Sequence, residues 1–349
     1  MRRASRAVRA GRLLIGGGFP VSVQTMWKKP LSSDALQEAA AGLRELERVG
    51  CDLVRFAVPD MASAECLGAL AAESPLPLAA DIHFDHRLAL RCLDFSVAKI
   101  RINPGNIGEE WKVRDVVAKA RDAGVCLRIG VNAGSLPHGL AAEHDVPAAM
   151  VKAAEEELAV MARLDFTEVV VSLKSSDVEQ TIEANRLFAS RCDYPLHVGV
   201  TEAGPLIPGI VKSALGIGGL LKEGIGDTVR VSLSASSLEE VIAGLEILRA
   251  TRVRRDGVEI VSCPRCGRSS FDVHLFLEEV SDFIHGIKKP LTVAVMGCVV
   301  NGPGEAKKAD IGITGAGKMA IIFKEGRAHR TVPFEEAASA FREEVEKLL

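Results

Sequence analysis

The chain has 349 residues, a formal net charge of -3, 48% hydrophobic residues and a mean hydropathy of +0.17. A chain of this length usually folds as two domains, and its slight negative charge argues against bulk nucleic-acid binding. It contains no run of about 18 apolar residues that could cross a membrane, and its basic start lacks the apolar core of a signal peptide, so we expect a cytoplasmic protein.

Residues 1–18 are predicted to form an irregular arm before the first strand. From Pro20 to about Val253 one unit then recurs: a short β-branched run, a polar turn and a helical pattern. Helices are predicted over ranges that include 32–50, 109–124, 177–192 and 238–253. Strands are predicted over 21–24, 52–58, 76–82, 97–103, 125–132, 168–174, 195–201 and 227–234.

Nearly continuous apolar strands that alternate with helices are typical of a parallel sheet. Eight such units predict an α/β fold in which residues 1–254 form an N-terminal (β/α)8 TIM barrel. The alternative is a doubly wound open sheet. It is disfavoured because no glycine-rich dinucleotide fingerprint follows the first strand.

The pattern changes after Gly257, and residues 255–349 are predicted to form a small α+β domain. Helices are predicted over 273–287 and 333–349. Strands are predicted over 258–262, 291–297, 309–315 and 319–326.

Eight cysteines without a secretion signal indicate a reducing compartment. Five of them lie singly in apolar segments and are predicted to be buried small hydrophobic residues: Cys51, Cys66, Cys92, Cys126 and Cys192. The other three lie in turn-rich sequence of the second domain. Cys263 and Cys266 form a C-x-x-C pair, and Cys298 precedes Glu305 by seven residues. Between these two lies Asn301-Gly302-Pro303-Gly304, a sequence typical of a turn and not of a helix or strand.

Three thiolates and one replaceable oxygen ligand suit a [4Fe–4S] cluster with one distinctive iron. Cys263, Cys266, Cys298 and Glu305 are therefore the candidate metal ligands. The alternative is a barrel that binds anions and carries a structural zinc site, which usually has a second C-x-x-C or a C-x-x-H. A radical enzyme that uses S-adenosylmethionine is a further alternative, but the region near the first strand lacks the three clustered cysteines it needs.

Basic side chains recur on the predicted barrel strands: Arg55, Arg101, Arg128, Lys174 and Arg230. The two-residue period of a strand places Asn103 on the face of Arg101, Asn132 on that of Arg128, and Ser232 on that of Arg230. An outward charge would press into the helix layer at a high cost, so we expect these side chains inside the barrel near its carboxyl end. Guanidinium groups suit a diphosphate ligand, although for any single arginine a structural ion pair is an equal alternative.

Further polar residues lie at the same predicted strand ends: Asp81, His83, His197 and Glu202. Asp81 and His83 are two residues apart and therefore share a face. For each histidine the alternative is a hydrogen-bonded imidazole of the core. Glu202 is a candidate proton donor if burial raises its pKa.

Several stretches together resemble the IspG (GcpE) family, the 4-hydroxy-3-methylbut-2-enyl diphosphate synthases of the methylerythritol phosphate pathway. These stretches are ADIHFDHRLAL, RINPGNIG, RIGVNAGSL, VSLKSSDV, VGVTEAG, EGIGDTVRVSLSA, CPRCGR and GCVVNGPGEA. The resemblance extends from about Arg9 to nearly the end of the chain. It implies a TIM barrel followed by a [4Fe–4S] domain, in the two-domain bacterial form.

The resemblance also implies the reaction, a two-electron reductive ring opening of 2-C-methyl-D-erythritol 2,4-cyclodiphosphate with loss of a hydroxyl as water. Flavodoxin or ferredoxin would supply the electrons. A homodimer is implied, in which the cluster domain of one subunit caps the barrel of the other. The diphosphate would be held by Arg55, Arg101, Arg128, Lys174 and Arg230, with Asp81, Asn103, Asn132, His197, Glu202 and Ser232 around it, and the cluster by Cys263, Cys266, Cys298 and Glu305.

Two stretches depart from the family pattern. Trp27-Lys28-Lys29 stands where a turn rich in threonine and asparagine is expected, and residues 205–209 replace a loop with glycine and serine. Both follow predicted strands, so contacts to the substrate are expected to differ there.

Overall fold

The computed structural model describes residues 1–103, 107–136 and 144–349. It divides into two compact units, Met1–Arg254 and Arg255–Leu349. No helix in these ranges is long and apolar enough to span a lipid bilayer.

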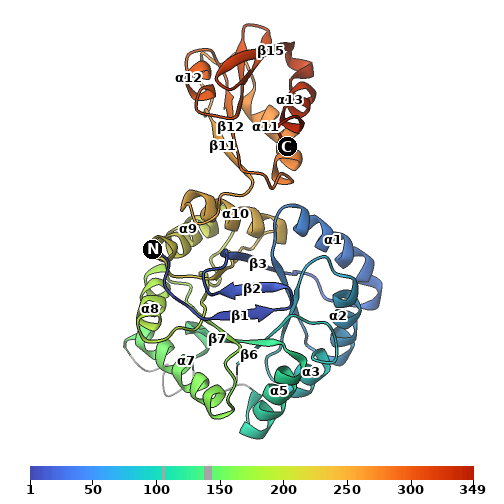
Figure 1. Ribbon diagram of the computed structural model, residues 1–349, viewed down its shortest axis with the longest axis vertical. Coiled ribbons are helices and arrows are strands. Elements are labelled where there is room, and N and C mark those ends of the chain that lie inside the picture. Colours follow the sequence, from blue (N-terminus) through green and yellow to red (C-terminus); the bar gives the residue numbers. More distant parts are fainter. Residues whose placement is uncertain (104–106, 137–143) are drawn as a thin grey trace. The chain divides into compact units, whose positions relative to one another are not determined.

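The first unit contains a closed ring of eight parallel strands (Figure 1). The ladder runs β8-β7-β6-β5-β4-β3-β10-β9, and a bridge between Val171 and Leu196 joins its two ends. The predicted TIM barrel is therefore confirmed, and an open sheet is excluded. The strands are β3 (Ser22–Met26), β4 (Leu53–Ala57), β5 (Leu78–Asp81), β6 (Lys99–Ile102), β7 (Cys126–Asn132), β8 (Val169–Lys174), β9 (His197–Val198) and β10 (Thr228–Val229).

Helices surround the ring and bury their apolar faces against it. Several begin at an aspartate that follows a strand, and the carboxylate accepts a hydrogen bond from a free N–H of the first turn, as Asp177 does from Gln180. The helices are α1 (Leu36–Arg48), α2 (Met61–Glu73), α3 (His86–Cys92), α5 (Glu110–Ala123), α7 (Val146–Arg163), α8 (Val178–Arg191), α9 (Leu206–Lys222) and α10 (Ser237–Ala250).

The expectation of an irregular N-terminal arm is wrong. Strands β1 (Ala7–Ala10) and β2 (Leu13–Gly16) form an antiparallel hairpin, whose two-residue loop begins at Gly11 with φ 59°. Its buried side chains pack against residues at the amino ends of the barrel strands, including Leu53 and Cys126. The hairpin therefore closes this end of the barrel (Figure 1).

The second unit is a five-stranded sheet in the order β11-β12-β13-β14-β15, with a separate apolar core. The first three strands are parallel and the last two antiparallel. The strands are β11 (Val258–Ser262), β12 (Leu291–Met296), β13 (Ile311–Ala316), β14 (Met319–Lys324) and β15 (Arg327–Pro333). The helices are α11 (Val273–His285), α12 (Gly302–Ala306) and α13 (Ala337–Glu346).

Two local predictions fail in this unit. Residues 301–304 were expected to be a turn, but Gly302 begins the short helix α12. Pro303 lies in the first turn of that helix, where a missing N–H costs no hydrogen bond. Strand β15 was not predicted, and the last helix begins at Ala337 and not at Pro333.

Candidate functional site

The five predicted cations of the barrel strands all lie inside the ring. Arg101 and Arg128 are neighbours on β6 and β7, and they are only 6% and 3% exposed. Arg101 donates to the carbonyl of Gly130 over 3.4 Å, and Arg128 donates to the Ser172 hydroxyl over 3.2 Å. Both contacts cross from one strand to the next within the interior.

Lys174 and Arg230 approach each other where β8, β9 and β10 end. Gly199 lies between them, and a methyl group on its Cα would lie 3.0 Å from Lys174 Nζ and 2.3 Å from the Arg230 carbonyl oxygen. Glycine is therefore required at this position, chiefly by the close approach of the Arg230 backbone. Arg55 of β4 completes the set, with a side chain that is 11% exposed.

One carboxylate lies among these cations at the end of β5. Asp81 is 3.4 Å from Arg55 Nε and 3.3 Å from Arg101 Nη1. Burial alone would raise the pKa of this carboxyl, but Arg55, His83 and Arg101 outweigh burial and lower the pKa below its ordinary value. Asp81 is therefore a fixed anion that holds two of the guanidinium groups in place.

A second carboxylate, Glu240, reaches the site from helix α10. It is 1% exposed and lies 3.5 Å from Arg230 Nε, and it accepts a hydrogen bond from Thr25 over 2.7 Å. Lys28 lies 2.5 Å from its other oxygen. Glu240 is not predicted from the sequence as part of the site. The available signal is its spacing from Gly244 and Ile247, which places an acid on the buried face of the helix.

The positive charges outnumber these two carboxylates, and the excess shifts several pKa values. Burial lowers the pKa of Lys174 well below its ordinary value, and Arg128 and Arg230 lower it further. The pKa of Arg128 is likewise depressed, by burial and then by Arg55 and Arg101. The pKa of Arg55 falls to about 10, chiefly through burial. An anion that entered the ring would relieve this repulsion.

Buried donors without partners point to the same ligand class. In the described residues, the Nε atoms of Arg55, Arg101, Arg128 and Arg230 are buried and make no hydrogen bond. Those of Arg55 and Arg230 are ion-paired with Asp81 and Glu240 at 3.4 and 3.5 Å, so among these four described donors the ones left without any side-chain partner are those of Arg101 and Arg128. Buried polar groups are normally satisfied, so several orphaned N–H groups in one place indicate that a ligand completes them. Phosphate oxygens match guanidinium donors in charge and geometry.

The remaining predicted residues lie along the same strands or just beyond them. His197 is fully buried, with Nδ1 at 3.4 Å from the Thr228 hydroxyl and Nε2 without a partner. Burial lowers its pKa well below the ordinary value, and Lys174 and Arg128 add to this effect, so the ring is neutral. Asn103 and Asn132 lie at the ends of β6 and β7, and Ser232 lies beyond β10; all three are partly buried.

Glu202 and His83 are more exposed. Glu202 follows β9 with φ 50°, a left-handed conformation that is rare for a residue other than glycine and recurs at functional sites. His83 lies 3.1 Å from Arg101 Nη1 with its side chain half exposed. It is therefore not a residue of the apolar core. Pro104, Gly105 and Asn106 of the RINPGNIG stretch fall outside the described residues.

Two of the candidate cluster ligands lie at the carboxyl end of the second sheet. Cys263 directly follows β11, and Cys298 comes two residues after the parallel neighbour β12, so both lie at the carboxyl ends of adjacent strands. The backbone N–H of Gly297 donates to Cys263 Sγ over 3.1 Å. Thr314 donates to the carbonyl of Cys298 over 2.9 Å, which ties this loop to β13.

Cys266 is exposed, and Glu305 is carried by α12 with its side chain 38% exposed. Within the described ranges, no three His, Cys, Asp or Glu side chains are arranged to hold one metal ion. A four-iron cluster takes one ligand on each iron, so its ligands stand farther apart than those of a single ion. The soft sulfur donors and the N–H bond to Cys263 fit an iron–sulfur cluster.

Comparison with known proteins identifies the family. Its profile described as "GcpE TIM-barrel domain" matches residues 5–245, and "GcpE protein C-terminal domain" matches residues 259–347. The chain belongs to the GcpE family. Two relatives carry the name 4-hydroxy-3-methylbut-2-en-1-yl diphosphate synthase (flavodoxin). The one from Treponema pallidum is 51% identical over 96% of this chain and 88% of its own length. The one from Thermodesulfovibrio yellowstonii is 48% identical over 99% of both chains.

Two similar solved structures cover about the length of the barrel unit. A dihydropteroate synthase from Xanthomonas albilineans superposes with a TM-score of 0.51 and 11% identity, covering 71% of this chain and 98% of its own. The enzyme from Yersinia pestis also has a TM-score of 0.51, with 12% identity over 71% of this chain and 99% of its own. At this level of identity the likeness concerns only the fold.

The departures from the GcpE pattern have defined places. Trp27 stacks on Phe56 with ring centroids 5.8 Å apart, and Lys28 joins Glu240 beside Arg230. Pro205 caps the amino end of α9, so residues 206–209 form its first turn and not a loop. The first departure therefore adds a cation next to the anion site.

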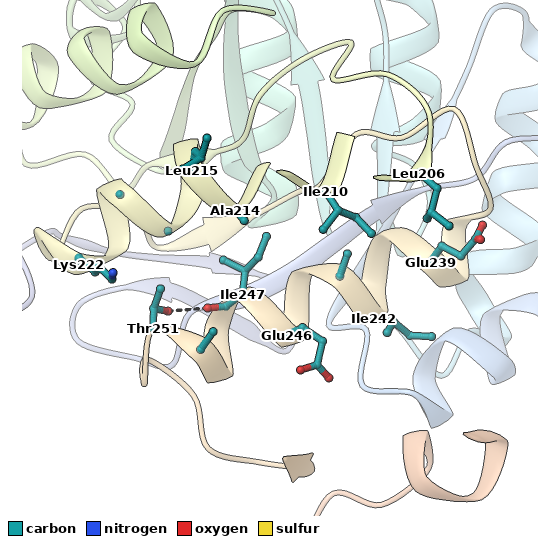
Figure 2. A pocket seen from close by; sticks show the side chains of 14 residues that line it. Leu206, Ile210, Ala214, Leu215, Lys222, Glu239, Ile242, Glu246, Ile247 and Thr251 are labelled. Atoms are coloured by element: carbon teal, nitrogen blue, oxygen red, sulfur yellow. Dashed lines mark hydrogen bonds between the residues drawn. The ribbon is translucent and has the colours of Figure 1, made fainter. Parts of the chain in front are cut away.

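A cavity of about 590 Å³ lies apart from the barrel interior, between α9 and α10 (Figure 2). Its lining is mainly apolar and includes Leu206, Ile210, Leu215 and Ile247. None of the predicted site residues lines it. We therefore assign no role in the chemistry to this groove.

Proposed function

We propose that this chain converts 2-C-methyl-D-erythritol 2,4-cyclodiphosphate to 4-hydroxy-3-methylbut-2-enyl diphosphate. The observation that carries the proposal is the cluster of buried arginines, with Nε donors that make no hydrogen bond, inside the barrel of a GcpE family member. The reaction consumes two electrons and two protons, opens the ring at a carbon–oxygen bond and releases one hydroxyl as water. The diphosphate remains attached to the carbon skeleton throughout, so one anion site serves substrate and product.

The barrel residues bind and orient the diphosphate. Arg101, Arg128 and Lys174 lie on consecutive strands and present their donors to one volume, while Asp81 keeps Arg55 and Arg101 from spreading apart. Preorganised donors of this kind need no rearrangement during the reaction. With the diphosphate fixed, the carbon skeleton points toward the open, carboxyl end of the barrel.

Cys263, Cys266, Cys298 and Glu305 are the residues that would hold a [4Fe–4S] cluster. When bound, such a cluster supplies the two electrons one at a time. Glu305 is the only oxygen donor in this set, and its ion pair with Lys308 is long, at 3.9 Å. Its carboxylate is therefore weakly held by the protein and free to change partners.

Glu202 is the proposed proton donor. Its side chain is exposed in the single chain, so a covering surface is needed to exclude water from it. We propose that this surface is the cluster domain of a second subunit in a homodimer. Phe84 at the barrel rim is 73% exposed, and Val299 and Val300 beside Cys298 are 53% and 63% exposed. Exposed apolar side chains on both surfaces are consistent with such a contact.

Flavodoxin or ferredoxin is the proposed electron donor, and the names of the relatives give flavodoxin. The test of the function is anaerobic reconstitution with iron and sulfide, followed by assay with the cyclodiphosphate and a chemical reductant. We expect brown protein that contains iron and acid-labile sulfide and forms the linear diphosphate. Colourless protein loaded with zinc, without turnover, would favour an anion-binding barrel with a structural zinc instead.

A further inference from the structure

A sixth cation, Lys99, lies deeper in the barrel than the five already described. It is the first residue of β6, two positions before Arg101, so it points inward one pleat below that residue. The rise of a parallel strand places the two Cα atoms about 6.6 Å apart. Lys99 is 1% exposed and lies one pleat below the residues that hold the diphosphate, so we place it behind them and not in contact with the ligand.

The contacts of Lys99 leave its charge uncompensated. Its ammonium donates to Gln24 Oε1 over 2.7 Å, and no carboxylate within the described ranges forms an ion pair with it. The amide nitrogen of Gln24 is itself buried without a partner. A buried ammonium with one neutral acceptor is costly, and the group lowers that cost by releasing its proton.

In the part of the chain that the structure describes, the groups that face Lys99 from the neighbouring strands include two further cations and no carboxylate. Cys126 lies beside it on β7, and burial raises the pKa of that thiol to about 12, so it contributes no negative charge. Arg128 and Arg55 repel the ammonium, and His197 is neutral. Ala79 on β5 and the hairpin side chains below are apolar. Burial and the two arginines lower the pKa of Lys99 to about 7.

We propose that Lys99 is a proton-linked positioning residue for the diphosphate, which takes up a proton from solvent when the anion binds above it. The anion offsets the repulsion from Arg55 and Arg128, and the ammonium in turn strengthens the field that holds the anion. Lys99 thus acts through the residues that contact the ligand. This inference rests on the diphosphate site proposed above.

The experiment is calorimetric titration of the complete protein with inorganic diphosphate, in buffers of different ionisation enthalpy. The dependence of the observed heat on the buffer gives the number of protons taken up. With a pKa of about 7, we expect uptake of about half a proton at pH 7 and most of one at pH 8, beyond that of the probe. Lys99→Met should lose this component, and its affinity at pH 6 should fall by about tenfold.

Inorganic diphosphate itself titrates in the same pH range. Its contribution cancels when the parent protein is compared with Lys99→Met, because both are titrated with diphosphate in the same buffers. Lys212→Met removes an equal charge from the exposed surface of α9 and should behave as the parent protein. Circular dichroism checks that each variant is folded. If Lys99→Met does not fold, Lys99→Gln takes its place: its amide can still donate to Gln24 but does not titrate, so it should likewise lose the proton uptake seen in the parent protein.

The failures are distinguishable. If diphosphate does not bind at all, the proposed function is wrong. If it binds and Lys99→Met takes up as many protons as the parent protein, His197 or Lys174 is the titrating group and only this inference is overturned. Binding to the parent protein without proton uptake beyond that of the probe overturns it equally.

Discussion

At the scale of single residues, the barrel interior is a balance between buried cations and few carboxylates. Asp81 and Glu240 each hold two cationic partners, and the other donors are left for a ligand. Such a site is costly in the free protein, and that cost is recovered when an anion binds. The substitutions that best test this site add one methyl group or remove one ionisable group.

Gly199→Ala tests how tightly the site is packed. The added methyl group would overlap the Arg230 carbonyl oxygen at 2.3 Å and crowd Lys174, so β9 and β10 must separate. We expect a loss of about 1–3 kcal/mol in the free energy of unfolding, together with weaker diphosphate binding. Gly134→Ala is the matched control, since a methyl group there meets no atom of the described residues within 4 Å. Equal stability of the two variants in chemical denaturation would contradict this packing.

Glu202→Gln tests the proposed proton donor. The amide keeps the shape and the loop conformation but cannot donate a proton, so turnover should fall by about 100-fold or more. Iron and sulfide content and diphosphate affinity should remain those of the parent protein. Turnover at the parental rate would remove Glu202 from the mechanism.

At the scale of elements, the β1–β2 hairpin and α13 illustrate two kinds of stabilisation. The hairpin contributes an apolar plug, whereas α13 carries Glu344, a buried acid surrounded by Lys324, Lys347 and His329. The hairpin stabilises by apolar packing and is tested by truncating a side chain. Glu344 stabilises by charge and is tested by changing the pH.

Ile15→Ala tests the plug. Ile15 is fully buried in β2, and its truncation leaves a cavity at the closed end of the barrel. We expect a loss of about 2–4 kcal/mol in the free energy of unfolding, measured in urea. Leu14→Ala, on the partly exposed opposite face of the same strand, should cost about 1 kcal/mol or less. Similar losses in the two variants would show that the hairpin does not seal the barrel.

Glu344 makes the second unit sensitive to acid. The hydrogen bond from Lys347, with further help from Lys324, lowers its pKa to about 2 from the ordinary 4.5. A lowered carboxyl pKa contributes stability that is present above about pH 4.5 and is lost as the pH falls toward 2. Glu344→Gln should therefore destabilise the protein at pH 6 and have a smaller effect at pH 3. Glu343→Gln, at an exposed position of the same helix, should show little change at either pH.

A feature of the fold or site could be predicted from the sequence where a local residue pattern determines it. The inward direction of Arg101 and Arg128 follows from the two-residue period of a strand. The same period applies to Lys99, but a lone lysine near the start of a predicted strand is usually exposed. The partnership of Glu240 with Arg230 depends on how α10 packs on the barrel, which sequence spacing alone does not specify. Strand β15 was missed because only Ala328 and Val332 are apolar, as is common for an edge strand.

At the scale of the whole molecule, the chain divides its cysteines between two chemical environments. Cys51, Cys92 and Cys126 are buried in the barrel unit, where burial raises their pKa values to about 12. In the second unit, Cys266 is exposed, and Cys263 and Cys298 are partly exposed. Since the thiolate is the reactive form, the two groups should differ in reactivity.

Alkylation followed by mass spectrometry tests this division. In metal-free protein we expect Cys266 to react first, Cys263 and Cys298 next, and the three buried thiols only after unfolding. Reconstitution with iron and sulfide should protect Cys263, Cys266 and Cys298 together. Cys66, which is partly exposed in the barrel unit, is the internal control and should react at the same rate before and after. A Cys298 that stays equally reactive after reconstitution would not be a cluster ligand.

The plugged floor of the barrel has a kinetic consequence. Because β1 and β2 close the amino end of the barrel, substrate and product must enter and leave through its carboxyl end. Product must dissociate before the next substrate molecule can bind, because both use the same opening and the same guanidinium groups. We therefore expect competitive product inhibition, which an excess of substrate fully reverses.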